Sequence, residues 1–201
     1  MSDKSDKAWD DFLNPDVIRP KLIVASLYIA AYEMLSNLIV DRIKSFYTTG
    51  FDASGPRIDP KYYVEVRSKN SSPVYASLQW LKESSAIDDS DIAVFGNVKR
   101  ARNELAHEIM NLLAKELPSD LHTRFAEMVS LIEKVEKWWI INVEIPATPD
   151  FDGHDIDEKD IICGPVIAIK LLIDVALGSD EDARSHLSEF RKLKPRSSTI
   201  Q

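Results

Sequence analysis

Apolar residues recur every three or four positions along most of this chain, and that spacing limits it to a helical fold. In the segment 20–47, for example, Leu27, Ala31, Met34 and Leu38 fall on one side of a helix with 3.6 residues per turn. We expect further helices over about 73–85, from 88–90 or just after 97 to before Pro118, and over 120–144, 158–177 and 180–193. This pattern predicts an all-α protein, and the short connections favour an up-and-down bundle of four to five long helices.

Two segments interrupt the helical pattern. Residues 50–72 contain clusters of Gly, Pro, Asn and Ser around the run Tyr62–Val66, which predicts a long loop with one strand-like stretch. Residues 146–157 are acidic and should form a second loop. A chain of 201 residues is long enough for one core, so we expect one helical domain over 20–178. An N-terminal extension would cover 1–19, and a short helix with a basic tail would cover 179–201.

Composition and charge exclude several classes of protein. The longest apolar run, from Leu22 to Tyr32, contains Ser26 and ends at Glu33, well short of the ~20 residues that a membrane span needs. The N-terminus lacks the form of a signal peptide, so we expect a cytoplasmic protein without a membrane partner. The single Cys163 cannot form an internal disulfide and should be a small buried apolar group. A net charge of −8 argues against nonspecific coating of nucleic acid, and no DNA partner is expected.

The segment 102–107, with sequence RNELAH, carries the most chemical information in the chain. Arginine stays cationic and can hold two phosphate oxygens at once, whereas histidine can take and give a proton near neutral pH. Lys99 and Arg100 add positive charge to the same stretch, while the acidic residues concentrate in 83–91, 150–160 and 180–189. We therefore predict a local phosphodiester site with Lys99 and Arg100 as RNA contacts. The alternative is a solvated helix face with an ordinary histidine.

Helical geometry indicates that this segment has a partner. The stripe predicted to face the core consists of Val94, Val98, Ala101, Leu105, Ile109 and Leu112. Asn103 and His107 lie opposite it, on the same side as Ala106, Met110 and Ala114. Such small and apolar residues are unusual on a surface that contacts only water, so a second copy or another helix of the same chain should cover them. Arg102 and His107 lie about 140° apart. They meet only if the arginine wraps around the helix or serves the histidine of a partner protomer.

The pattern Arg-Asn-x-x-x-His on a helix of an all-α chain resembles the signature of the HEPN superfamily (higher eukaryotes and prokaryotes nucleotide-binding domains). The likeness covers the helix order over about 20–177, but its specific part is six residues. It implies an HEPN-like homodimer whose two copies form a metal-independent ribonuclease site, with no cofactor. On this resemblance Arg102 would hold the scissile phosphate and His107 would act as general acid or base. Asn103 would orient His107 or a phosphate oxygen.

The resemblance also bears on biological role. Family members serve in toxin–antitoxin pairs, phage defence and RNA processing, which implies an RNA substrate and an antitoxin protein as partner. In toxins paired with a nucleotidyltransferase, a tyrosine two residues after the histidine is modified, and here that position is Ile109. Many members have lost nuclease activity, so the alternative is a catalytically silent dimeric module that binds a nucleotide, RNA or a protein. Retention of Arg102 and His107 favours the enzyme.

Other residues are weaker candidates. Glu33, set in the apolar first helix, either tunes His107 or is a carboxylate at the edge of the bundle. The loop 150–157 lacks the glycine that a calcium loop needs at its sixth position, so we expect no metal site there and a solvated turn in which Asp157 caps the next helix. Three aromatic residues could stack on RNA bases but are more typical of core or loop-anchoring positions: Tyr62, Tyr63 and Trp80.

Overall fold

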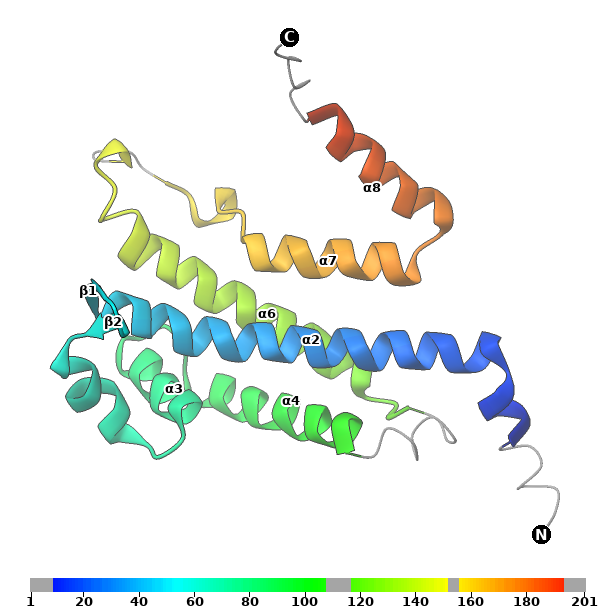
Figure 1. Cartoon of the computed structure of the whole chain (residues 1–201), viewed down its shortest axis with the longest axis horizontal. Coiled ribbons are helices and arrows are strands. Elements are labelled where there is room, and N and C mark those ends of the chain that lie inside the picture. The colour runs from blue at the N-terminus through cyan, green and yellow to red at the C-terminus, as the bar shows by residue number, and fades with distance from the viewer. Residues whose placement is uncertain (1–8, 108–116, 152–155, 194–201) are drawn as a thin grey trace.

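The computed structural model describes residues 9–107, 117–151 and 156–193, and within these ranges the chain is mostly helical with one small hairpin (Figure 1). The all-α prediction is therefore confirmed. The long helices are α2 (Pro15–Phe46), α3 (Pro73–Glu83), α4 (Asp89–His107), α6 (Leu121–Trp139), α7 (Gly164–Leu177) and α8 (Asp180–Leu193). No described feature tests the division into a domain over 20–178 and two terminal segments, which stays a prediction.

Helix α2 is the axis of the molecule. It contacts α3, α4, α6 and α7, and Figure 1 shows α4 and α7 on opposite sides of it. The helix begins earlier than the predicted Pro20, because Asn14 caps it by accepting a hydrogen bond from the Asp16 N–H at 3.0 Å and Pro15 occupies the first turn. Pro20 therefore lies inside the helix.

The length and apolar character of α2 exceed what the sequence run led us to expect. Its most apolar 18-residue window has a mean hydropathy of 1.6, which is enough to cross a membrane by length and composition. Of that window, 39% is buried inside the molecule. A helix with neighbours on several sides needs apolar residues around most of its circumference, and core helices of soluble proteins pass the same test.

The segment 48–72 differs from the predicted loop with a strand-like stretch at Tyr62–Val66. Strands β1 (Thr48–Asp52) and β2 (Gly55–Ile58) pair as an antiparallel hairpin before that run. The run itself is a π-helical turn, so the strand expectation was wrong. Burial explains why: Tyr62 and Val66 are buried while Tyr63 and Val64 are exposed, a helical spacing rather than the alternation of a strand. A 3-10 turn, Arg67–Lys69, then leads to α3.

The later helices are shorter than predicted. The α-helical part of the fourth predicted helix ends at Trp139 and continues as a π-helical turn, Ile140–Glu144. A 3-10 turn, Pro149–Phe151, follows. The next predicted helix, 158–177, is divided into a 3-10 turn at Glu158–Asp160 and α7 from Gly164. Asp157 caps that turn by accepting a hydrogen bond from the Lys159 N–H at 2.9 Å, so its predicted capping role is confirmed.

The core lies where α2, α3, α4 and α6 meet. The predicted inner stripe of α4 is confirmed for Val98, Ala101 and Leu105, which are buried. Cys163 is also buried, as predicted. Tyr28 joins α2 to α4 by donating a hydrogen bond from its hydroxyl to the Val98 carbonyl at 3.3 Å. The largest fully buried side chains include Tyr28, Phe95, Leu35, Ile39, Ile43, Leu78, Leu81, Leu105, Met128 and Ile132.

Candidate functional site

The Arg102 side chain leaves α4 toward α2, where the Glu33 carboxylate binds it. Arg102 Nε donates to Glu33 Oε1 at 3.1 Å, and Nη2 contacts the same oxygen. Nη1 donates to Asn103 Oδ1 at 3.2 Å. The guanidinium carbon lies 5.4 Å from the centre of the Tyr32 ring, a cation–π distance. Three neighbours on two helices therefore orient the guanidinium.

This arrangement follows from the position of Arg102 at the edge of the buried stripe of α4. Leu105 and Ala101 face the core, and Arg102 lies on the adjacent side of the helix, next to α2. Its side chain is 29% exposed and that of Glu33 is 46% exposed. A pair with this much water access contributes at most about 1 kcal/mol. A phosphate group can therefore compete for the guanidinium without disrupting the fold.

His107 occupies a different environment. It is exposed, as is Ala106 beside it, so no described element of the same chain covers this part of the outer face of α4. Within the described ranges, neither a hydrogen bond nor an ion pair joins His107 to Arg102. Met110 and Ala114, which complete the predicted outer face, lie outside the described residues, and so does Ile109. Within the described residues, hydrogen bonds join Glu33, Arg102 and Asn103, and none of these bonds includes His107.

The two basic residues just before the motif, Lys99 and Arg100, lie in different surroundings. Lys99 is half-buried, with its Nζ 4.7 Å above the centre of the Tyr75 ring on α3. Arg100 is exposed. At 100° per residue, positions 100, 103 and 107 fall within about 60° of one another on the outer side of the helix. Of the two predicted RNA contacts, Arg100 therefore shares a face with Asn103 and His107.

The sequence left open whether Glu33 tunes His107 or lies at the edge of the bundle, and in the structure its contact is with Arg102. Sequence reasoning missed Tyr32 altogether. The available signal was the stripe Tyr28, Tyr32 and Leu35 on α2, which marks Tyr32 as inward-facing and places Glu33 at its edge. Among the described residues, no group of three His, Cys, Asp or Glu side chains could hold a metal ion.

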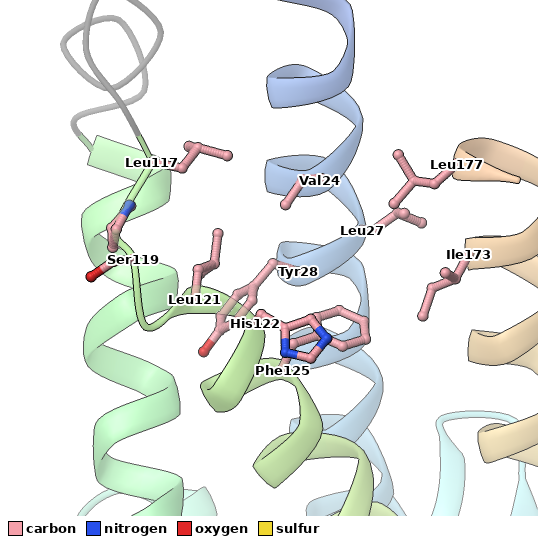
Figure 2. Close-up of a pocket in the computed structure, with 11 residues that line it drawn as sticks. Val24, Leu27, Tyr28, Leu117, Ser119, Leu121, His122, Phe125, Ile173 and Leu177 are labelled. Atoms are coloured by element: carbon pink, nitrogen blue, oxygen red, sulfur yellow. The ribbon is translucent and has the colours of Figure 1, made fainter.

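A second feature is an apolar pocket of about 400 Å³ between α2, α6 and α7. Figure 2 shows Leu27 of α2 near Leu177 of α7, and His122 of α6 also lines the pocket. Tyr28 also lines it, and burial raises the pKa of that phenol to about 12, so the hydroxyl stays protonated. The sequence did not predict this pocket because its walls come from segments far apart in the chain.

Comparisons with protein-family models, curated proteins and solved structures found no match to this chain. The likeness to the HEPN superfamily therefore rests on the six-residue motif and on the helical class of the fold.

Proposed function

We propose that the protein is a metal-independent endoribonuclease of HEPN type, with a site made from Arg102 and His107 where two copies meet. The observation that carries the proposal is the difference in surroundings between Arg102 and His107 on α4. Glu33 and Asn103 orient the arginine, while the histidine on the same helix stays exposed and accessible to a substrate.

Two copies account for the geometry better than one. Arg102 is turned toward α2, so in one chain it does not wrap around α4 to reach His107. The exposed Ala106 and His107 leave room for a second protomer against the outer face of α4. A symmetric pairing there would place Arg102 of one protomer near the partner's His107, and would do so twice.

The reaction is an attack of the ribose 2′-oxygen on the adjacent phosphorus. His107 removes the 2′-hydroxyl proton or protonates the departing 5′-oxygen, and water supplies or takes up the other proton. The P–O5′ bond breaks, leaving a 2′,3′-cyclic phosphate and a 5′-hydroxyl. Acid–base assistance of this kind is worth ~10²–10⁴-fold in rate. Arg102 compensates the charge that accumulates on the phosphoryl oxygens, which adds a comparable factor.

End-group analysis of cleaved RNA tests this mechanism. We expect wild-type protein to cleave in EDTA and to give cyclic phosphate and 5′-hydroxyl ends. Arg102→Ala and His107→Ala should each lower the rate by at least about a hundredfold. The control is Lys44→Ala, which removes an exposed basic residue near the C-terminal end of α2. This variant should cleave RNA at the wild-type rate. Loss of cleavage in EDTA, or 3′-hydroxyl and 5′-phosphate ends, would contradict the mechanism.

The pairing of Arg102 with Glu33 favours a second candidate, a silent dimeric module that binds a nucleotide, RNA or a protein, because the carboxylate neutralises much of the guanidinium charge. In that case wild type and both variants leave RNA intact.

A toxin–antitoxin or phage-defence role is part of the proposal. Expression of the wild-type chain should arrest growth with loss of total RNA, and Arg102→Ala and His107→Ala should not. Equal growth of all three strains would remove the toxin role.

A further inference from the structure

Helices α7 and α8 lie on the side of α2 away from α4 (Figure 1). Helix α7 is mostly apolar, and its two charged residues, Lys170 and Asp174, lie four positions apart along one edge. Val166 and Ile169 are buried against the body of the protein. Its outer side chains remain 39–54% exposed: Ile167, Leu171, Leu172 and Val175. An exposed apolar face of this kind fits an interface.

Helix α8 extends away from the body next to this surface (Figure 1). One edge of it is held by its own chain, since His186 Nε2 lies 3.3 Å from Asp174 Oδ2 of α7. Leu187 is 48% exposed and Phe190 is 57% exposed. The helix therefore has an inner edge against α7 and an outer strip in contact with solvent.

The charges at the two ends of that outer strip match a second copy of the same helix. At 100° per residue, four exposed residues fall within about 60° of one another: Asp180, Arg184, Leu187 and Arg191. Asp180 lies in the first turn and Arg191 in the last turn, with Arg184 and Leu187 between them. In an antiparallel pair, Asp180 of each copy faces the partner's Arg191. A parallel pair would place like charges opposite each other.

We infer that this chain self-associates by antiparallel pairing of α8 across a two-fold axis. Leu187 packs near the axis, two Asp180–Arg191 ion pairs flank it, and the exposed face of α7 extends the contact. Such an interface is isologous, so each copy gives and receives the same contacts. It lies away from α4 and is independent of the proposed ribonuclease site. If α4 also pairs, the assembly is a tetramer with two kinds of interface.

Charge reversal in the full-length chain tests the pairing directly. Asp180→Arg makes the strip basic at both ends, and Arg191→Asp makes it acidic at both ends. Each variant alone should self-associate at least about tenfold more weakly, because like charges then face each other. The molar mass, measured by sedimentation equilibrium, should fall by half at a concentration where the wild type is associated. Glu189→Arg reverses a charge on the far side of α8 and should keep the wild-type mass.

Mixing the two variants distinguishes a loss of pairing from damage to the helix. An equimolar mixture of Asp180→Arg and Arg191→Asp should regain the wild-type mass, since a basic strip then faces an acidic one. Circular dichroism of each variant reports whether α8 remains helical. A wild-type chain that shows no association through α8, with the same mass in all variants, overturns the proposal and leaves the surface for a different protein. A mixture that stays dissociated overturns it as well.

Discussion

At the scale of single residues, the motif arginine has a defined counter-ion. Glu33 Oε1 accepts from two nitrogens of Arg102, and the Tyr32 ring lies beside the guanidinium. The carboxylate thus orients the cation and weakens its field toward solvent. Residues that orient an anion-binding group in this way set both its affinity and its position.

Replacing Glu33 with Gln separates these two effects. The amide oxygen still accepts a hydrogen bond from Arg102, but the negative charge is gone. We expect RNA binding at low salt to tighten several-fold, and the free energy of unfolding to change by less than about 1 kcal/mol because the pair is half-exposed. Fluorescence anisotropy and urea unfolding measure these quantities. Glu83→Gln, which breaks the remote Lys69 pair, is the control. Unchanged or weaker RNA binding would show that Arg102 does not bind the phosphate.

Among the described residues, Glu136 is a carboxylate buried in the bundle. It is 2% exposed, with Arg42 Nη2 lying 2.8 Å from Oε2 and 2.7 Å from Oε1. The donor geometry satisfies only Oε2, so among the described residues Oε1 lacks a hydrogen bond. Burial raises the pKa of Glu136, and the nearby Arg42 charge offsets part of that rise. The folded protein therefore holds this proton more tightly than the unfolded chain does.

This proton linkage predicts how stability depends on pH. The stabilisation from protonated Glu136 is complete below the ordinary carboxyl pKa of 4.5 and is lost as pH rises through the raised pKa of the folded state. Glu136→Gln removes the linkage. The free energy of unfolding of the variant minus that of wild type should therefore increase with pH over this range. Urea unfolding at pH 4.5, 6 and 7.5 measures it, and a difference that is constant or falls with pH contradicts the assignment.

The residue contacts of the site were the least predictable part. Glu33 and Arg102 are 69 positions apart, and their contact depends on how α2 and α4 pack, which the spacing of apolar residues does not specify. The motif residues could be identified from the sequence because the motif depends only on local spacing. The residues that contact them could not be predicted from the sequence.

At the scale of elements, α4 has one structural side and one side available for function. Leu105 is fully buried in the core, whereas Ala106, the next residue, is exposed. Because the two positions are adjacent on one helix, substitutions at them compare the buried and the exposed side of α4 in the same backbone context.

Leu105→Ala should lower the free energy of unfolding by about 2–5 kcal/mol, since it opens a cavity in the core. Ala106→Ser, on the exposed side, should change it by no more than about 0.5 kcal/mol. Chemical denaturation of both variants checks this. A small cost at Leu105 would mean that the inner face of α4 is not packed as described.

Element prediction succeeded where periodicity was long and failed where it was short. The first helix, with its apolar residues repeated over many turns, was placed correctly apart from its start. The run Tyr62–Val66 was predicted as strand-like, because a run of five residues, four of them β-branched or aromatic, fits a strand or a helical turn equally well. The hairpin before it depends on a register shift between Thr48 and Gly50 and on a turn at residues 53–54 that leads into Gly55, whose φ is 119°. Composition indicated a loop there but not the strand pairing.

At the scale of the whole molecule, α2 has a distinct surface on each side. The α4 side carries Arg102 and His107, and the α7 side carries exposed apolar residues. The order of helices followed from the sequence, as did the outward position of His107. The sequence did not predict which surface binds which partner, because an interface between copies depends on features that one chain does not need for its own fold.

The most direct test of the central claim is complementation between two inactive chains. Arg102→Ala and His107→Ala chains, carrying different tags, are co-expressed, and the mixed assembly is purified and assayed on RNA. If each site takes Arg102 from one protomer and His107 from the other, one of the two sites is intact and about half of the wild-type rate should return. A mixed assembly no more active than either variant alone would contradict a shared site.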